Sequence, residues 1–182
     1  MEFRYELKIP KERVAVLIGR KGETKKELEA VTKSRITVDS KDGDIFICGE
    51  DGLGLYNAFE VIKAIGRGFN PEVALLLLKP DYMFESINVK DFAKTVNSEL
   101  RLKGRVIGKD GKSRKTIEEL TECYVCVYGK SIGIIGEVEG VDNARTAIES
   151  LLKGSTHANV YKFLEKKRRQ LKRKQLQGEN FG

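Results

Sequence analysis

The sequence has few of the residues that catalysis and metal binding need. It contains one histidine, His157, and three cysteines, Cys48, Cys123 and Cys126. The last two have C-x-x-C spacing, but nothing nearby completes a zinc site, and an odd count without an export signal argues against a disulfide framework. We expect buried, structural cysteines. No paired carboxylates, triad or metal set has a usable spacing, so we expect no catalytic residue, no metal, no cofactor and no enzymatic activity.

Long apolar runs are also absent. The longest spans Val73 to Leu78, whereas a membrane-spanning helix needs about 20 apolar residues. The opening residues, MEFRYELKIP, alternate in polarity and carry charges, which is not typical of a signal peptide. We therefore expect a cytoplasmic protein without a membrane span, and we expect it to be a monomer.

The residue type at one position excludes a nucleotide-binding P-loop. Residues 104–120, GRVIGKDGKSRKTIEEL, contain Gly111, Lys112 and Ser113 in the order that ends a P-loop. The first glycine of that motif would fall at Val106, and a β-branched residue does not easily adopt the left-handed backbone of a phosphate cradle. A G-x-G-x-x-G turn is absent as well. The segment is therefore more consistent with a loop that grips another kind of phosphate.

Positive charge is concentrated near the C-terminal end of the sequence. The net charge is +7, and residues 161–182 hold eight basic residues against Glu165 and Glu179. Such a tail suggests a polyanionic partner. The tail residues expected to contact nucleic acid are Lys166, Lys167, Arg168, Arg169, Lys172, Arg173 and Lys174. The alternative is that this run is only a solvated helix face.

The G-x-x-G segment occurs twice. Residues 14–32, VAVLIGRKGETKKELEAVT, match residues 103–121, KGRVIGKDGKSRKTIEELT, at an offset of 89. The match continues from RITV to YVCV and from IFICG to IGIIG, where the offset falls to 87 because the second hairpin turn is shorter. Two copies of one small domain therefore explain the chain better than one large domain.

Each copy predicts the order strand, helix, G-x-x-G, helix, strand, strand, helix (β-α-α-β-β-α). This is an α+β fold, with a three-stranded antiparallel sheet covered by helices. In the first copy, Leu28 and Val31 should share one face of the second helix. The segment EVALLLL, residues 72–78, should form a short helix buried where the copies meet, which would make them a rigid pair. The expected boundaries are 1–69 for the first domain, 70–81 for the linker helix, 82–157 for the second domain, and 158–182 for a basic C-terminal helix.

These residues resemble the KH family in its type I order. The resemblance rests on Ile18 to Gly22 and on Val106 to Gly111, each followed by a helix, a threonine and a hairpin rich in β-forming residues. KH modules clamp about four nucleotides of backbone with their G-x-x-G loop. The resemblance therefore implies two type I KH domains that bind single-stranded RNA.

The chemistry of the loops supports this interpretation. Their glycines lack a Cβ, so a sugar-phosphate chain can approach the main chain closely, and the next helix offers free N–H groups. The apolar residues expected to floor a groove for unstacked bases are Val106, Ile107, Ile117, Val125 and Val127. The predicted RNA-binding residues of the second copy are Gly104, Arg105, Val106, Ile107, Gly108, Lys109, Asp110, Gly111, Lys112, Ser113, Arg114 and Lys115. A possible second RNA or protein site in the first copy comprises Gly19, Arg20, Lys21, Gly22 and Lys25.

Charge favours the second copy as the main RNA clamp. Glu23 follows the first loop directly, where the second copy has Lys112. A carboxylate there would repel phosphate, and phosphate neutralisation dominates affinity. The first copy could instead be a structural or protein-binding domain. Both copies depart from the usual KH pattern, since Lys25 and Arg114 stand where an apolar residue is common, and this suggests extra phosphate contacts.

A closer resemblance is to the KH-domain ribosome-assembly factors known as partner-of-Nob-one, in their short archaeal form. It is carried by RVIGKDGKSRKTIEELT, VYGKSIGIIG and THANVYKFLEKKRR, and residues 154–164, GSTHANVYKFL, are a specific signature. It implies binding to the 3′ region of small-subunit rRNA near the site of its final maturation. It also implies two protein partners, the maturation endonuclease Nob and the alpha subunit of translation initiation factor two.

The leading hypothesis is a non-catalytic, single-stranded RNA-binding protein of small-subunit ribosome assembly. Two alternatives stay open. The first is a general single-stranded RNA binder in mRNA metabolism. The second is a protein-interaction scaffold whose loops have drifted and which contacts RNA only through its basic tail. In that tail, Val160, Phe163, Leu164 and Leu171 are spaced for a helix that packs on the second domain.

Overall fold

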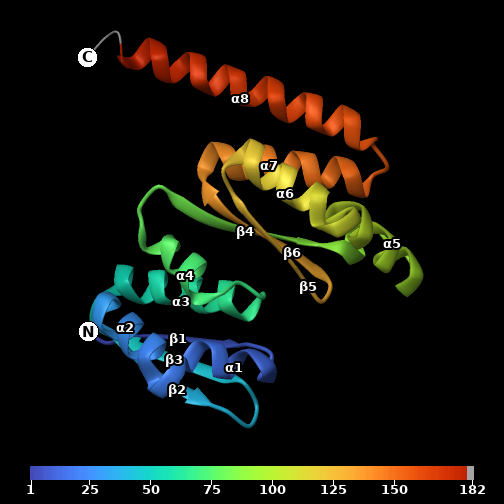
Figure 1. Ribbon diagram of the computed structural model, residues 1–182. Coiled ribbons are helices and arrows are strands. Elements are labelled where there is room, and N and C mark those ends of the chain that lie inside the picture. Colours follow the sequence, from blue (N-terminus) through green and yellow to red (C-terminus); the bar gives the residue numbers. More distant parts are fainter. Residues whose placement is uncertain (180–182) are drawn as a thin grey trace. The chain divides into compact units, whose positions relative to one another are not determined.

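The computed structural model describes residues 1–179, which fall into two compact units, Met1–Phe84 and Glu85–Gly182 (Figure 1). Each unit contains one copy of the repeat and one three-stranded antiparallel sheet. The α+β fold with two repeated domains and a C-terminal helix is therefore confirmed, while the rigid pairing of the domains stays a prediction. Within the described residues, none of the helices is both long enough and apolar enough to span a lipid bilayer.

The first unit has the element order expected from the repeat. Its elements are β1 (Phe3–Lys8), α1 (Lys11–Ile18), η1 (Arg20–Gly22), α2 (Glu23–Thr32), β2 (Arg35–Asp39), β3 (Asp44–Gly49) and α3 (Gly52–Gly66). The strands lie in the order β1, β3, β2, and α3 packs on this sheet and on both α1 and α2. Ile47 of the central strand is fully buried and lies opposite both Tyr5 and Ile36. The central strand therefore supplies the core between sheet and helices.

The second unit repeats this plan. Its elements are β4 (Tyr82–Asn88), which begins at the end of the first unit, η3 (Val89–Asp91), α5 (Val96–Ile107), η4 (Lys109–Gly111), α6 (Lys112–Thr121), β5 (Tyr124–Tyr128), β6 (Ser131–Glu137), α7 (Val138–Leu152) and α8 (His157–Glu179). The strands lie in the order β4, β6, β5. Residues 131–136 of the central strand are all buried. Helix α8 packs on α6 and α7 (Figure 1), so it is an added element of this domain.

The apolar segment after α3 forms two short helical turns, α4 (Pro71–Ala74) and η2 (Leu75–Leu78), which pack on α3 in the first unit. Asn70 caps α4 because its side chain accepts a hydrogen bond from the Val73 N–H at 3.0 Å. Pro71 occupies the first helical position, where a missing N–H costs nothing. The expected short helix therefore forms, and its leucine-rich half is wound as a 3₁₀ helix.

Of the two apolar residues expected on one face of α2, only Leu28 is buried. Val31 is 58% exposed, whereas Leu28 is fully buried. The next buried residue is Thr32, whose hydroxyl donates to the Leu28 carbonyl at 2.6 Å. Thr121 makes the same bond to Ile117 at 2.6 Å in the second unit. Each of these helices therefore buries a threonine one turn after its apolar residue, because the backbone carbonyl satisfies the hydroxyl.

A carboxylate ties the second helix of each copy to the strand that follows it. Glu118 accepts a hydrogen bond from the Val125 N–H at 3.0 Å, and Arg114 Nη1 lies 2.6 Å from its other oxygen. Glu29 makes the equivalent bond to the Ile36 N–H at 3.1 Å. The repeat therefore preserves a side-chain-to-backbone link that sets where each hairpin begins.

Replacing Glu118 by alanine should destabilise the second unit. The substitution leaves the Val125 N–H without its acceptor, and an unsatisfied buried group costs about 1–3 kcal/mol. Arg114→Ala removes only the partly exposed ion pair, which is worth about 0.2–1 kcal/mol. Urea denaturation of both variants measures the difference. Equal and small losses would show that the bond between carboxylate and backbone contributes little.

The three cysteines should differ in reactivity. Cys123 is buried, whereas Cys48 and Cys126 are only partly buried, which corrects the expectation that all three are core residues. Burial is the main cause that raises the pKa of the Cys123 thiol to about 11, so only about one thiol in a thousand is ionised at pH 8. Because the thiolate is the reactive form, iodoacetamide should modify the other two cysteines first. Peptide mass spectrometry follows the order, and early modification of Cys123 would contradict it.

Candidate nucleic-acid interface

The loop of the second copy joins α5 to α6 through a tight turn. Gly108 and Gly111 have φ angles of +74° and +72°, and Asp110 between them has a φ of +54°. The turn ends at the start of α6, where the first N–H groups have no acceptor within the helix. These donors and the positive end of the helix dipole make this end of α6 suitable for binding an anion.

The two glycines of this loop are needed for different reasons. A Cβ on Gly108 would lie 2.7 Å from both the backbone nitrogen and the Cβ of Ser113. A Cβ on Gly111 would meet only the ends of Arg114 and Lys115, at 4.0 Å. Packing inside the protein therefore excludes any side chain at Gly108. At Gly111 the positive φ favours glycine, and the space beside it leaves the main chain open to a ligand.

Ser113 is the buried polar residue of the loop. It is 2% exposed, and its hydroxyl oxygen has no hydrogen-bond partner among the described residues. A buried hydroxyl without a partner is unfavourable. This one belongs to the second residue of α6, at the end that attracts anions. The unpaired hydroxyl is therefore consistent with a ligand phosphate as its missing partner.

Three exposed lysines surround the loop: Lys109, Lys112 and Lys115. Arg105 does not join them. Its Nε donates to the Leu151 carbonyl at 3.1 Å, and its Nη2 donates to the Ser155 carbonyl. The Arg105 guanidinium therefore stabilises the C-terminal end of α7, and its expected contact with RNA stays a prediction.

Arg114 and Lys25, the two cations at the unusual KH position, are also engaged within the protein. Arg114 pairs with Glu118, and Lys25 pairs with Glu29 at 3.1 Å. Each holds the carboxylate that binds the next strand. Both side chains remain partly exposed, at 33% for Arg114 and 29% for Lys25. Their structural role is therefore clear, and an additional phosphate contact stays a prediction.

Only some of the apolar residues expected to form the floor of the base-binding groove are exposed. Val106 and Ile117 are fully buried and Val125 is 4% exposed, so these side chains belong to the core and do not line a groove. Ile107, at the end of α5, is 36% exposed. Leu100 lies on the same face of that helix seven residues earlier and is 58% exposed. The exposed apolar surface next to the loop therefore comes from α5, and Leu100 was missed because it precedes the matching part of the repeat.

Further features of α5 and β5 suit contact with bases. Gly104 is exposed, and a Cβ there would meet nothing within 4 Å. β5 is an edge strand on which Tyr124 is 44% exposed. The Val125 N–H points to the outer edge of the sheet, where the Glu118 carboxylate accepts from it. Backbone groups alternate in direction along a strand, so those of Val127, two residues later, also point to the outer edge. The unit thus combines an apolar helix face with main-chain donors and acceptors at a strand edge.

The first copy has the same loop backbone. Gly19, Lys21 and Gly22 have φ angles of +74°, +54° and +76°, which nearly equal those of the second loop. A Cβ on Gly19 would collide with the side chain of Thr24, which corresponds to Ser113. The predicted residues Arg20 and Lys21 are exposed on this turn. Loop conformation therefore does not distinguish the two copies.

Charge does distinguish them. Glu23 is exposed directly after the first loop. The hairpin turn of the first unit carries Asp39, Asp42 and Asp44, whose carboxylate oxygens lie within 4.8 Å of one another. The corresponding turn in the second unit is Gly129-Lys130, and Lys103 Nζ donates to the Gly129 carbonyl at 2.9 Å. The second loop itself carries Asp110 where the first has Lys21, so the charge difference lies in the residues around the loops, and tighter phosphate binding by the second copy stays a prediction.

The basic tail is the helix α8. The Thr156 side chain caps it by accepting from the Asn159 N–H at 3.2 Å, and His157 Nε2 lies 2.8 Å from the Arg105 carbonyl. Val160 and Leu164 are 3% and 1% exposed, where the helix packs on α6 and α7. The apolar spacing seen in the sequence therefore anchors the helix to the second domain. Residues 180–182 of the predicted tail lie outside the described residues.

The tail cations occupy several faces of α8. Lys167 and Arg168 are partly buried, and Lys167 Nζ lies 5.8 Å from the centre of the Phe163 ring. The other predicted tail residues are exposed: Lys166, Arg169, Lys172, Arg173 and Lys174. Lys162, which was not among the predicted site residues, is exposed as well. The helix therefore presents most of its charge to solvent.

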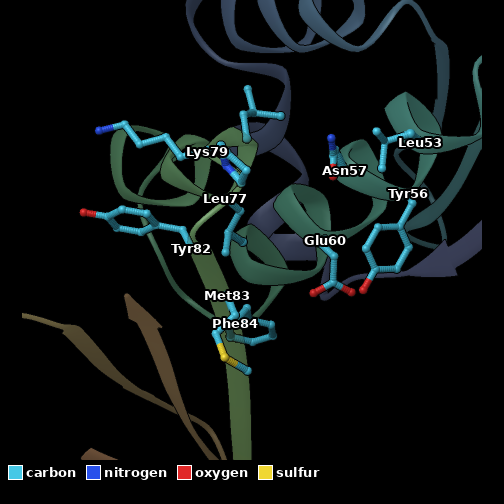
Figure 2. A pocket seen from close by; sticks show the side chains of 11 residues that line it. Leu53, Tyr56, Asn57, Glu60, Leu77, Lys79, Tyr82, Met83 and Phe84 are labelled. Carbon is cyan, nitrogen blue, oxygen red and sulfur yellow. The ribbon is translucent and has the colours of Figure 1, made fainter. Parts of the chain in front are cut away.

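A cavity of about 480 Å³ lies in the first unit between α3, η2 and the start of β4 (Figure 2). Figure 2 shows Tyr56 and Glu60 on α3, with Tyr82, Met83 and Phe84 on the neighbouring strand. Burial raises the pKa of Glu60, against the opposing effect of Lys63. None of the lining residues was predicted as a site, because the sequence signals were glycines and cations, and the cavity has few of either.

Two family models match the chain. The model of the eukaryotic-type KH domain (KH-domain type I) matches residues 83–169, and the KH-domain model matches residues 4–64. Together they cover both copies of the repeat, including both G-x-x-G loops.

Related proteins agree with these models. A KH domain-containing protein of Methanocaldococcus jannaschii is 50% identical over 171 residues, which are 92% of this chain and 75% of that protein. The RNA-binding protein PNO1 of Oryzias latipes is 34% identical over 131 residues, which are 70% of this chain. This chain spans about half of that PNO1 protein, 54% of its length.

Solved structures are similar in fold and in sequence. The crystal structure of Dim2p from Pyrococcus horikoshii OT3 has a TM-score of 0.84 and 45% identity, covering 90% of this chain and 99% of that chain. A chain in the a/eIF2alpha–aDim2p–rRNA complex from Pyrococcus horikoshii OT3 has a TM-score of 0.87 and 43% identity, covering 93% of this chain and 96% of that chain. The protein therefore belongs to the PNO1/Dim2 family of tandem KH-domain proteins.

Proposed function

We propose that this protein is a non-catalytic RNA-binding factor of small-subunit ribosome assembly. It grips the single-stranded 3′ region of small-subunit rRNA, mainly through its second KH domain, and assists the maturation of that region as a cytoplasmic monomer. The observation that carries the proposal is the Gly108–Gly111 turn, because an open main chain, an unpaired buried hydroxyl and exposed lysines meet there.

The loop acts on the phosphate backbone. The space beside Gly111 admits a sugar-phosphate chain to the first N–H groups of α6. The Ser113 hydroxyl gains the acceptor that the protein itself does not supply. Lys109 and Lys112 neutralise the phosphates, and this charge term supplies a large share of the affinity.

The surfaces beside the loop act on the bases. Ile107 and Leu100 offer exposed apolar area on α5, and Gly104 leaves room for a planar ring against the helix. The outer edge of β5 offers main-chain groups that can hydrogen-bond base edges. Such a surface requires unstacked bases, so single-stranded RNA fits it and a duplex does not.

The relatives support ribosomal RNA as the target. A Chaetomium thermophilum relative is called a pre-rRNA-processing protein, and a similar chain occurs in a complex with rRNA and a/eIF2alpha. The same complex supports the alpha subunit of translation initiation factor two as a protein partner. The endonuclease Nob is proposed as a second partner from the sequence resemblance.

Lys109→Asp should weaken binding to an rRNA 3′-end oligonucleotide by roughly tenfold or more. The change removes a phosphate contact and puts a second acid beside Asp110, and phosphate neutralisation controls affinity. Lys109 is exposed, so the fold should be unaffected. Fluorescence anisotropy at several salt concentrations, with the rRNA oligonucleotide and a scrambled one, measures the effect.

The matched control is Arg20→Asp, at the same position of the first loop. It should change binding less than Lys109→Asp does. The opposite ranking would make the first domain the reader. Equal binding of both RNAs, reduced by Lys109→Asp, would favour a general single-stranded RNA binder. If neither loop variant had an effect, the scaffold alternative would be favoured.

Gly111→Ala should impair RNA binding more than it impairs folding. The added methyl group occupies the approach to the main chain, while inside the protein it meets nothing closer than 4.0 Å. The left-handed φ costs about 1–2 kcal/mol. Gly22→Ala carries the same strain, with φ of +76°, in the first loop. Urea denaturation should show similar losses for both, whereas RNA titration should separate them. Equal RNA affinities would contradict the assignment of the second loop as the clamp.

A further inference from the structure

Helix α8 has one face that the protein does not use internally. Val160 and Leu164 anchor the opposite face to the second domain. An α-helix turns by 100° per residue. The side chains on the side of α8 opposite these anchors are therefore separated by four, three and four residues. They are Lys162, Lys166, Arg169 and Arg173, and all four are exposed. We call this set the α8 cation stripe.

The α8 cation stripe is continuous and straight. Its ends are 11 residues apart along the sequence, which corresponds to about 16 Å of helix axis. Neighbouring cations are three or four residues apart, and one acid, the exposed Glu165, flanks the series. Among the residues that the structure describes, none of the ion pairs involves these four side chains.

This arrangement is unfavourable for the helix alone. Like charges at i,i+4 destabilise a helix, whereas opposite charges stabilise it. Elsewhere the same chain uses the favourable pairs, namely Lys25–Glu29, Arg114–Glu118 and Arg145–Glu149. On α8 the i,i+4 pairs Lys162–Lys166 and Arg169–Arg173 both repel, and Glu165, four residues before Arg169, is the one acid placed to offset this. A row of anions outside the protein would relieve this repulsion.

The stripe offers charge without stacking surfaces. Its members are all lysine or arginine, and the aromatic residues of α8 lie elsewhere. Tyr161 packs against His157 with ring centres 6.0 Å apart, and Phe163 is covered by Lys167. Single strands that bind outside a G-x-x-G loop commonly need aromatic side chains that stack with bases, beside a positively charged groove. Double-stranded RNA is recognised instead through its shape and its phosphates, which a straight row of cations can follow.

The stripe begins near the loop of the same domain. His157, the first residue of α8, lies 2.8 Å from the carbonyl of Arg105, three residues before Gly108. We propose that the α8 cation stripe binds the phosphate backbone of double-stranded RNA. This goes beyond the proposed function, since it adds a second RNA site that does not need the G-x-x-G loop. An RNA with a single-stranded end in the loop would then place its neighbouring duplex along α8.

A blunt RNA hairpin without a single-stranded end isolates the α8 cation stripe from the loop. The test variant combines Lys166→Gln with Arg169→Gln. The control combines Lys172→Gln with Lys174→Gln, which removes the same charge from exposed positions outside the stripe. The test variant should bind the hairpin roughly tenfold more weakly, with a shallower dependence on salt, because two phosphate contacts are lost. The control should stay within about threefold of the unchanged protein. Circular dichroism confirms that both variants keep the helix.

Lys109→Asp separates this inference from the proposed function. It should leave binding of the blunt hairpin unchanged even where it abolishes binding of the rRNA 3′-end oligonucleotide. Equal weakening by test variant and control would overturn the inference, because charge alone and not its placement would then matter. Loss of hairpin binding in Lys109→Asp would also overturn it. The inference would also be overturned if the test variant had a lower affinity only for single-stranded RNA, or only for anionic phospholipid vesicles, and kept its affinity for the hairpin.

Discussion

The close approach of Gly108 to Ser113 is the constraint on which the second domain depends. The backbone can turn from α5 into α6 within four residues only because no Cβ stands between them. This turn sets the two helices so that Val106 and Ile117 both enter the core. It also directs the start of α6 outward, with its N–H groups exposed to a ligand. The packing constraint and the anion site are therefore consequences of one turn.

The first domain has the same turn, but the charges around it differ. Its loop has nearly the same dihedral angles, and its Glu29 makes the same link to the next strand. Its hairpin turn, however, carries three carboxylates, and Glu23 follows its loop. Under the proposal above, acids within a Debye length of about 8 Å of a bound phosphate would lower the affinity of the first domain for it without altering the fold. The two copies therefore differ in the charges around the loop while its backbone is retained.

Much of the fold could be predicted from the sequence because the repeat supplied an internal comparison. Residues that match at a fixed offset must occupy equivalent positions, so two weak G-x-x-G motifs became one strong prediction of two domains. The predictions that failed concern tertiary packing. Val31 has a helical spacing from Leu28 but is exposed, whereas Thr32 can be buried because its hydroxyl donates to the Leu28 carbonyl. Leu100 lies before the matching segment, and the cavity beside Glu60 is formed by residues brought together from α3, η2 and β4. No pattern of neighbouring residues in the sequence predicts the exposure of Leu100 or the presence of this cavity.

The arginines and lysines show why a count of positive charges overestimates a nucleic-acid surface. Arg13 of α1 donates to the Ile65 and Phe69 carbonyls at 2.8 and 2.7 Å, much as Arg105 does at the end of α7. The two lie 92 residues apart, not 89, so they occupy different places in the repeat and perform the same structural task. A guanidinium can do this because its donors form a rigid fork that reaches two carbonyls at once. The ammonium groups of Lys109 and Lys112 have no such geometry and stay in solvent. In this fold, therefore, the hydrogen bonds that each cation makes within the protein, as for Arg105 and Lys103, indicate how much of its charge is available to RNA.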